Sequence, residues 1–500
     1  MKRRVRRVAV VGRNAAAWLS ALAIHRSLGA SGVQVEVVEL PSRLSEADVY
    51  ATLPSLSALH GLLGIDEEII LRACRGVPIA AQRFANWSGG APAFFLPYDD
   101  EPPPGGELPF IHYWLKARKA GLRVALEDFS LGAMAAKAGK IPAIGEPALG
   151  LSAGYGLDLD ARAYSGLAKH LSGRSGIQVT SSPISSVMVE ADRITAVEIS
   201  DGRRIEADLF IDASGEERAL IGRMPGAEFE SWDEWLFCDR MIAASAPRLN
   251  SLPAFSHIAA FRGGWVALRP LQDRIAVTAV YSSRAVSDNE VAQQMPVLAR
   301  MPLGGDAVLS TLRQGAQKKP WIGNCVAIGE SAISLEPLDA GVLHIVHGCL
   351  THLMTLFPVT AEAFPEAEAY NRVMGRFGAN LRDFEILHYR LNRRFDEAHW
   401  DAIRDVPPPE TLARKLDLFA ARGDVPLYDD ETFQARSWMA SMLGHGLMPE
   451  SYDPRIDSIP EESQIALVQQ QLRDVAELVR KMPPVDEFVA SICQVEAAAS

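Results

Sequence analysis

The chain has 500 residues, 48% of them hydrophobic and 22% charged, which is typical of a globular protein with a large core. Its formal net charge of −12 argues against a general affinity for nucleic acid, because binding to phosphates needs a positive field. The 5 cysteines are scattered without CxxC spacing, so we expect reduced thiols and neither a disulfide framework nor a zinc site. We also expect a cytoplasmic protein without a signal peptide or a membrane-spanning segment.

The N-terminal 40 residues alternate between strand and helix patterns. Residues 8–11 form a continuous apolar run that ends in Gly12 and predicts a buried parallel strand. Apolar residues at helical spacing follow over 15–28, and a second apolar run over 33–38 ends in Glu39. Together these segments predict a βαβ unit, the entry unit of a dinucleotide-binding fold.

The middle of the chain is rich in predicted strands, and its last third is mostly helical. We expect strands over 177–179, 187–189, 194–199, 204–211, 264–268 and 275–281, and a surface loop over 99–107. We expect helices over 338–356, 366–390 and 465–481. The first of these helices contains His344, His347 and His352, but no carboxylate or cysteine stands at ligand spacing, so we expect no metal site.

The loop after the first predicted strand departs from the motif of dinucleotide-binding folds. That motif is G-x-G-x-x-G, and its three glycine positions are here Gly12, Asn14 and Ala17. Asn14 tolerates a left-handed backbone, so the turn can survive, but its side chain takes space that phosphate oxygens would use. Glu39 ends the second strand, where a carboxylate accepts hydrogen bonds from a ribose. These residues alone are equally compatible with cofactor binding and with a unit kept only for folding.

Seven further motifs resemble the flavin-dependent tryptophan halogenases in order and spacing. They are residues 126–131 (LEDFSL), 208–215 (DLFIDASG), 235–240 (WLFCDR), 270–282 (PLQDRIAVTAVYS), 324–338 (NCVAIGESAISLEPL), 382–389 (RDFEILHY) and 437–454 (SWMASMLGHGLMPESYDP). Each motif alone is weak, but with the βαβ unit the resemblance runs from the first strand to about residue 455.

The resemblance implies an α/β protein with a glutathione-reductase-like, FAD/NAD-binding Rossmann fold, an inserted β-sheet substrate region and a helical C-terminal cap. The expected domains are 1–360, with inserts at about 75–125 and 225–320, and a mostly helical 361–500. The implied cofactor is FAD, reduced by a separate flavin reductase, together with a halide ion and an aromatic small molecule or peptide as substrate. Besides Gly12, Asn14, Ala17 and Glu39, the resemblance places Thr52, Asp212, Gly215 and Gly329 at the cofactor, and His112 and Trp438 at the substrate pocket.

Several residues that the family chemistry needs, as the resemblance implies it, are replaced. The family lysine, which holds or activates the oxidant, lies eight positions before the tryptophan of an F-x-N-W motif and corresponds to Ile79, which can do neither. Arg83 is on the same face as Ile79 if the segment is one strand, but it would stay cationic and be a poor nucleophile. The family glutamate corresponds to Asp339, which is shorter by one methylene, and the halide-binding Ser and Thr correspond to Ala340 and Gly341.

The segments that face the flavin in the family are altered as well. The family strap G-V-G-E-[AS]-T corresponds to residues 47–52 (ADVYAT), where only the last two residues fit. A family glycine against the flavin corresponds to Ile333, and our hypothesis is that Tyr50 and Ile333 fill the space of a flavin ring. In the family motif W-x-W-x-I-P, here 265–270 (WVALRP), one Trp and the Pro remain. Because these departures collect where small molecules bind, we predict that tryptophan halogenation is weak or lost.

The sequence leaves three functional hypotheses open. The first is a non-catalytic family member that pairs with a homologous halogenase subunit or with a second copy of itself. The second is an active flavin-dependent halogenase or monooxygenase with an altered aromatic substrate, which uses Asp339 and Arg83. The third is a nicotinamide-dependent reductase that uses the βαβ unit from Gly12 to Glu39.

Overall fold

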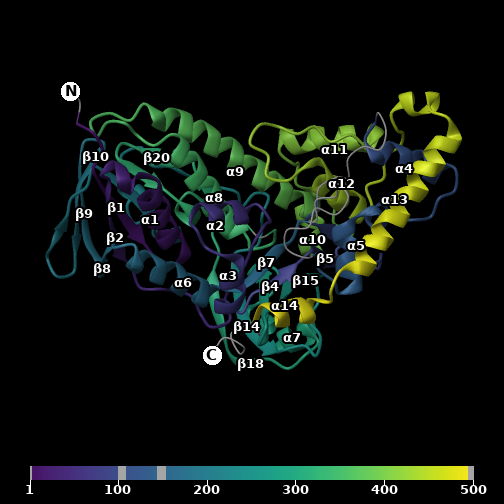
Figure 1. Cartoon of the computed structure of the whole chain (residues 1–500), viewed down its shortest axis with the longest axis horizontal. Helices are drawn as coiled ribbons and strands as arrows, with labels where there is room; N and C mark the ends of the chain where they lie inside the picture. The colour runs from purple at the N-terminus through teal and green to yellow at the C-terminus, as the bar shows by residue number, and fades with distance from the viewer. Residues whose placement is uncertain (1–2, 100–107, 143–153, 340, 494–500) are drawn as a thin grey trace. The chain divides into compact units, whose positions relative to one another are not determined.

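The computed structural model describes residues 3–99, 108–142, 154–339 and 341–493, and the chain forms two compact units (Figure 1). The first unit comprises residues 1–76, 159–234 and 310–379, and the second comprises 77–158, 235–309 and 380–500. The fold class is as predicted: mixed α/β, with a parallel Rossmann-like sheet and a helical C-terminal region. The domain limits 1–360 and 361–500 stay a prediction.

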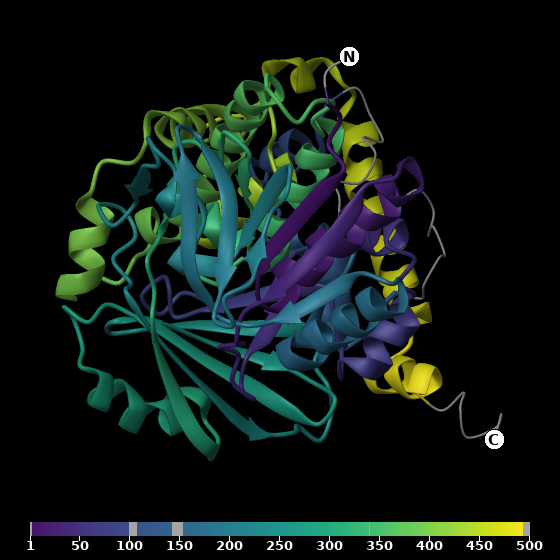
Figure 2. The ribbon, with the colours of Figure 1, turned by 90° about the vertical axis from the view of Figure 1, so that its left-hand side faces the viewer.

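A six-stranded sheet with the order β20-β21-β12-β1-β2-β8 is the centre of the first unit (Figure 2). All its neighbours are parallel except the edge pair β20 and β21. β1 is central because its run of buried valines can be covered on both faces. The strands of this unit are β1 (Arg7–Gly12), β2 (Gln34–Glu39), β3 (Val49–Ala51), β8 (Gln178–Ser181), β9 (Ile184–Glu190), β10 (Arg193–Ile199), β11 (Arg204–Ile205), β12 (Leu209–Ala213), β13 (Phe229–Ser231), β19 (Gly315–Gln317), β20 (Trp321–Ile322), β21 (Cys325–Ala327) and β22 (Ile333–Ser334).

The single strand expected over 204–211 is in fact two strands that belong to different sheets. β11 pairs antiparallel with β10, whereas β12 pairs parallel with β1 and β21. β9, β10 and β11 form a separate three-stranded antiparallel sheet. The chain leaves this sheet before it enters the parallel sheet at β12, and this change of partner interrupts the hydrogen-bond ladder. The alternation of charged and apolar residues over 204–211 did not reveal the interruption.

Helix α1 packs against β1 and β2 and against two other helices of the first unit, α6 and α8. Its alanines and leucines favour a helix, and nine of its side chains are buried. The helices of this unit are α1 (Asn14–Leu28), α2 (Leu56–Leu62), α3 (Glu67–Ala73), α6 (Ala161–Arg174), α8 (Gly341–Thr355) and the first half of α9 (Glu366–Arg390). The predicted βαβ unit is therefore present, with β1 and β2 parallel and adjacent.

The second unit is built on a seven-stranded sheet with the order β18-β14-β17-β16-β15-β5-β6, in which β14 to β17 pair antiparallel. Small and β-branched side chains of β14 to β17 form its core with helix α7 (Asp288–Ala299). Two short strands, β4 and β7, pair beside it. The strands are β4 (Val77–Ile79), β5 (Ala81–Ala85), β6 (Phe94–Pro97), β7 (Gly156–Asp160), β14 (Arg240–Pro247), β15 (Phe255–Phe261), β16 (Gly264–Pro270), β17 (Arg274–Tyr281) and β18 (Gly304–Thr311).

Helices make up the rest of the second unit. They are α4 (Phe110–Lys119), α5 (Leu131–Ala138), α10 (Ala398–Asp405), α11 (Glu410–Arg422), α12 (Ala435–Gly444), α13 (Glu461–Lys481) and α14 (Val485–Cys493), with the second half of α9. The helices expected over 366–390 and 465–481 correspond to α9 and α13. Most of the loop expected over 99–107 lies outside the described residues.

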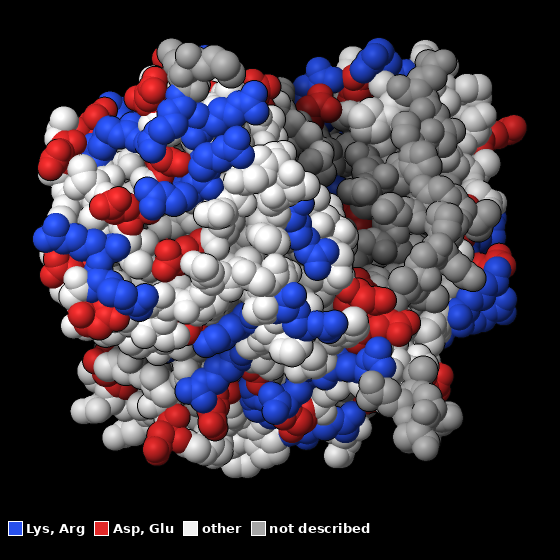
Figure 3. All heavy atoms as spheres, turned by 60° about the vertical axis from the view of Figure 1, so that its left-hand side comes forward, with Lys and Arg blue, Asp and Glu red and all other residues white. Residues whose placement is uncertain are grey.

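Within the described ranges, no helix is long and apolar enough to cross a membrane. On the face shown in Figure 3, basic side chains gather in short groups that acidic side chains interrupt.

Candidate functional site

The sheet of the first unit brings several predicted cofactor residues to one edge. β1 ends at Gly12 and β2 ends at Glu39, and these two residues are paired in the sheet. Gly12 also pairs with Ala213 of β12, which lies between Asp212 and Gly215 in the sequence. Gly329 follows β21, the next strand of the sheet. The carboxyl ends of parallel strands are where such sheets bind ligands.

The turn from β1 into α1 keeps the backbone of a dinucleotide loop despite its altered sequence. A Cβ atom at Gly12 would lie 2.3 Å from the carbonyl oxygen of Ala213, so only glycine fits there. Asn14 has a φ of +56°, in the left-handed region that asparagine tolerates. Ala17 is fully buried in α1. The turn therefore survives the loss of the second glycine.

Tyr50 of β3 lies at the N-terminus of α1. Its hydroxyl lies near the backbone of Ala15, and its ring lies edge-on to that of Tyr164, with centroids 6.1 Å apart. Burial raises the pKa of Tyr50 well above its usual value, so the phenol stays neutral. The free N–H groups of a helix N-terminus attract phosphate, and here a buried phenol lies beside them.

Glu330 follows Gly329 and lies among charged groups of the first unit. Its pKa is raised to about 7, mainly because burial penalises the carboxylate and also because Glu216 is near, while Arg218 and Arg13 act in the opposite direction. A carboxyl group with this pKa is about half ionised at neutral pH. Glu330 therefore adds negative charge beside the turn at which an anionic cofactor would have to bind.

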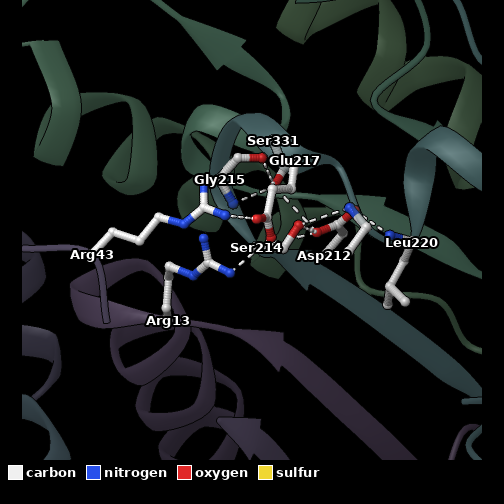
Figure 4. A network of polar contacts seen from close by, with 9 residues as sticks. Arg13, Arg43, Asp212, Ser214, Gly215, Glu217, Leu220 and Ser331 are labelled. Carbon is white, nitrogen blue, oxygen red and sulfur yellow. Dashed lines mark hydrogen bonds and ion pairs between the residues drawn. The ribbon is translucent and has the colours of Figure 1, made fainter. Parts of the chain in front are cut away.

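Asp212 holds the loop after β12 together (Figure 4). One carboxylate oxygen accepts the backbone N–H groups of Leu220 and Ile221, both at 2.8 Å. The other accepts the backbone N–H of Ser214 at 3.0 Å and the hydroxyls of Ser214 and Ser331 at 2.6 and 3.2 Å. The Ser331 hydroxyl also lies 3.0 Å from the backbone N–H of Gly215. The predicted cofactor residues Asp212 and Gly215 are thus bonded within the protein itself.

Three arginines line a cavity of about 720 Å³ beside this loop: Arg13, Arg43 and Arg223. The carboxylate of Glu217 pairs with Arg13 at 2.8 Å and with Arg43, and so bridges two of these cations (Figure 4). Glu39, expected to accept a ribose, accepts instead from the ammonium of Lys169 at 2.6 Å.

The residues at the predicted halide and acid positions lie before and at the start of α8. Asp339 is buried, with 9% of its surface exposed, and Gly341 is the first residue of the helix. Ala340 lies outside the described residues. Thr52 is buried in the segment after β3, and the Ile333 side chain lies 3.1 Å from where a Cβ of Gly378 would be.

In the second unit, Ile79 and Arg83 lie in two different strands. We expected them to share a face only if their segment were one strand, and this condition is not met. Ile79 ends β4 and pairs with Gly156 of β7, whereas Arg83 lies in β5, next to His257 of β15. The chain changes sheets at Ala80, which the apolar sequence did not indicate. Ile79 is 1% exposed, and the Arg83 guanidinium lies 3.1 Å from the His257 ring nitrogen Nδ1.

Both residues expected at the substrate pocket are fully buried and bonded inside the second unit. His112 contacts Asp424 through Nε2 at 3.1 Å and accepts the backbone N–H of Asp453 at 3.2 Å. The indole N–H of Trp438 donates to the carbonyl oxygen of Phe433 at 3.2 Å. Both side chains therefore have hydrogen-bond partners within this unit, and their place at a substrate pocket stays a prediction.

Sequence reasoning missed the charged residues that follow β12. Glu216, Glu217 and Arg218 stand where a parallel strand ends, and that position was the available signal. Arg218 is 7% exposed, and its guanidinium lies 3.6 Å from the centroid of the Phe229 ring.

The fold and this sheet edge define a protein of the dinucleotide-binding α/β class, and comparison with known proteins narrows the class. The chain belongs to the tryptophan halogenase family, whose sequence profile matches residues 7–461.

Individual relatives cover nearly the whole chain. The sequence is 28% identical to tryptophan 7-halogenase KtzQ of Kutzneria sp. (strain 744), over 98% of this chain and 99% of that protein. The structure is similar to BrvH, a flavin-dependent halogenase from Brevundimonas sp. BAL3, with a TM-score of 0.91 and 32% identity over 98% of this chain and 99% of that one. It is also similar to Xcc4156, a flavin-dependent halogenase from Xanthomonas campestris, with a TM-score of 0.93 and 30% identity over the same shares.

Proposed function

We propose that this chain is a flavin-dependent halogenase-family protein that halogenates tryptophan weakly or not at all and acts as a non-catalytic subunit. The observation that carries the proposal is the buried side chain of Tyr50, whose hydroxyl lies beside the first turn of α1. A phosphate group at that helix terminus would have to displace it.

The residues present fit one half of FAD better than the other. The cavity with Arg13, Arg43 and Arg223 offers cations and space to the adenosine monophosphate half, although Glu217 competes for two of the arginines. Tyr50 and Glu330 stand against the remainder, one by occupying the helix terminus and the other by its charge. Since the flavin half does not fit, we assign no redox step to this site.

The position of the family lysine supports the same proposal. Ile79 is buried in a strand and offers only hydrocarbon, so it can neither donate a hydrogen bond to hypohalous acid nor form a bond with it. Asp339 keeps a carboxylate, but its reach is shorter than that of glutamate by roughly 1 Å, which is enough to lower the rate of a positioned reaction.

The alternative is an active flavin-dependent halogenase or monooxygenase with a different aromatic substrate. It is supported by the 32% and 30% identity to two proteins described as flavin-dependent halogenases. The reductase hypothesis is less well supported, because Lys169 already pairs with the Glu39 carboxylate that a nicotinamide dinucleotide would need.

Titration with oxidised and with reduced FAD, followed by fluorescence quenching and thermal shift, tests the proposal. We expect no shift in melting temperature at high FAD for the wild type. The double variant Tyr50→Val/Glu330→Gln should gain binding, because it frees the helix terminus and removes a negative charge. Micromolar binding by the wild type, or halide-dependent turnover of an indole, phenol or pyrrole with a flavin reductase, would favour the alternative.

A further inference from the structure

Three basic side chains gather on one face of the seven-stranded sheet in the second unit. Arg83 of β5 stands opposite His257 of β15 in the sheet register, and Nη1 of its guanidinium lies 3.1 Å from the ring nitrogen Nδ1 of His257. Arg300 follows the last residue of α7 and acts electrostatically on both of these side chains. The three residues belong to segments far apart in the sequence, so only the fold brings them together.

This basic cluster lies on the face of the sheet that α7 covers in part. Side chains alternate along a strand, so His257 points to the same face as Phe261, which packs in the core beneath α7. Ser256 points to the opposite face, where its hydroxyl donates to Asp158, the partner of the buried Arg269. The basic cluster is therefore separate from that ion pair.

Within the described ranges, no carboxylate balances the basic cluster. No ion pair joins Arg83 or Arg300 to an acid, and the side-chain charges that act on Arg83 and His257 are all positive. The C-terminal dipole of α7 favours the cation of Arg300, but its effect falls off within the last turn of the helix. Like charges repel one another, so this arrangement costs stability in a chain whose net charge is −12.

The basic cluster carries two positive charges and offers N–H donors from three side chains. Burial, together with the charges of Arg83 and Arg300, lowers the pKa of His257 to about 4, so its ring is neutral. Because a guanidinium can only donate, Nδ1 of His257 accepts from Arg83 and the ring proton is on Nε2. Arg83 and His257 are half-buried and Arg300 is exposed, so a ligand can reach them from solvent.

We propose that the basic cluster of Arg83, His257 and Arg300 binds a doubly charged phosphate group. A phosphate monoester carries a charge of about −1.5 to −2 at neutral pH, which matches two arginines. One arginine can satisfy a planar carboxylate with two parallel N–H groups, whereas the three oxygens of a phosphate suit donors from separate side chains. The site involves neither flavin nor halide, so it stands whether or not the chain is a catalyst.

Calorimetric titration with methyl phosphate and with dimethyl phosphate tests the site, because the two probes differ by one negative charge. At constant ionic strength and about pH 8, where the monoester is a dianion, we expect methyl phosphate to bind about tenfold more tightly than dimethyl phosphate. Inorganic phosphate distinguishes the two sources of the group: equal affinity to methyl phosphate assigns an ester, and binding of inorganic phosphate alone assigns the free anion. Equal binding of the two methylated probes, or no binding of any phosphate, would overturn the proposal.

A charge-removing variant and its matched control connect binding to the basic cluster. Arg300→Gln should weaken the binding of the preferred phosphate about tenfold, because it removes a charge-assisted hydrogen bond at an exposed position that tolerates the change. Arg284→Gln, a change at an exposed arginine of the same unit outside the basic cluster, should leave the affinity unchanged. Equal losses in the two variants would mean that binding depends only on net charge and would refute the site.

Crystals of the wild type soaked with tungstate locate the anion directly. Tungstate is a tetrahedral dianion like phosphate, and anomalous scattering locates its tungsten atom. Tungsten beside Arg83, His257 and Arg300 supports the proposal, whereas tungsten bound only at other places refutes it.

Discussion

Replacing Asp212 by asparagine separates a structural role of this carboxylate from a role in cofactor binding. Its two oxygens accept three backbone N–H groups and two hydroxyls, all from the same unit. A residue whose bonds are all internal should matter for stability without any cofactor present. The predicted change is therefore a loss of stability in the purified protein alone.

The size of the loss follows from the donors that each variant leaves unsatisfied. In Asp212→Asn the new amide can face the Ser214 and Ser331 hydroxyls, which can turn and accept, so that only the Ser214 backbone N–H loses its acceptor. One buried unsatisfied N–H costs about 1–3 kcal/mol. Asp212→Ala leaves all three N–H groups unsatisfied, which costs about 3–9 kcal/mol, a large fraction of the total stability of a typical domain.

Urea unfolding followed by circular dichroism and tryptophan fluorescence measures these losses. The expected order is wild type, then Asp212→Asn, then Asp212→Ala, with the alanine variant partly unfolded in buffer. Asp192→Asn, an exposed position in the same unit, is the matched control and should change stability by less than about 0.5 kcal/mol. If Asp212→Asn unfolds at the wild-type midpoint, the internal bonding of this carboxylate is not what holds the loop.

Three further changes have defined outcomes. Lys415→Met removes the buried cation that pairs with Glu431 and should lower the free energy of unfolding by about 3–5 kcal/mol in urea titration, with the loss reduced when Glu431→Leu is added. Glu330→Gln should leave stability unchanged below pH 4.5 and increase it progressively towards pH 7 in thermal melts. The sign follows from the raised pKa: the native state keeps the proton of Glu330 up to about pH 7, whereas the unfolded chain releases it near 4.5, so the wild type loses stability between these values. Glu217→Gln should tighten the binding of ADP severalfold in calorimetry, because Arg13 and Arg43 lose their internal anion, and an unchanged affinity would mean that the cavity they line does not bind phosphates.

Two segments of the candidate cofactor site, the turn after β1 and the strap at residues 47–52, accommodate their substitutions in different ways. At the turn after β1, Asn14 adopts a left-handed backbone with a φ of +56°, and the turn is kept. At the strap, the buried side chain of Tyr50 lies beside the helix terminus, and the space for a ligand is what changes. A sequence shows each as a departure from a motif, but only the contacts separate a tolerated change from one that competes with a ligand.

A buried ion pair in the second unit is another contact that the sequence did not indicate. Arg269 takes the place of an isoleucine in a motif of the family, and it is 2% exposed. Asp158 lies 3.6 Å from it, and burial raises the pKa of that carboxyl to about 6. The two residues are far apart in the chain, so nothing local in the sequence indicated that this arginine had a partner.

The amino-acid sequence by itself determined the βαβ unit, the long helices α9 and α13 and the family, because periodic apolar patterns and ordered motifs depend on neighbouring residues. Only the tertiary structure decided which polar groups bond to one another: Asp212 with the loop after β12, and Glu217 with two arginines. A cavity of about 320 Å³ among β6, α4 and α12 belongs to the same class of feature, since its walls come from segments more than 300 residues apart. Hydrogen bonds and cavities depend on distances of a few ångströms between such segments, and those distances are set by the packing of the whole unit.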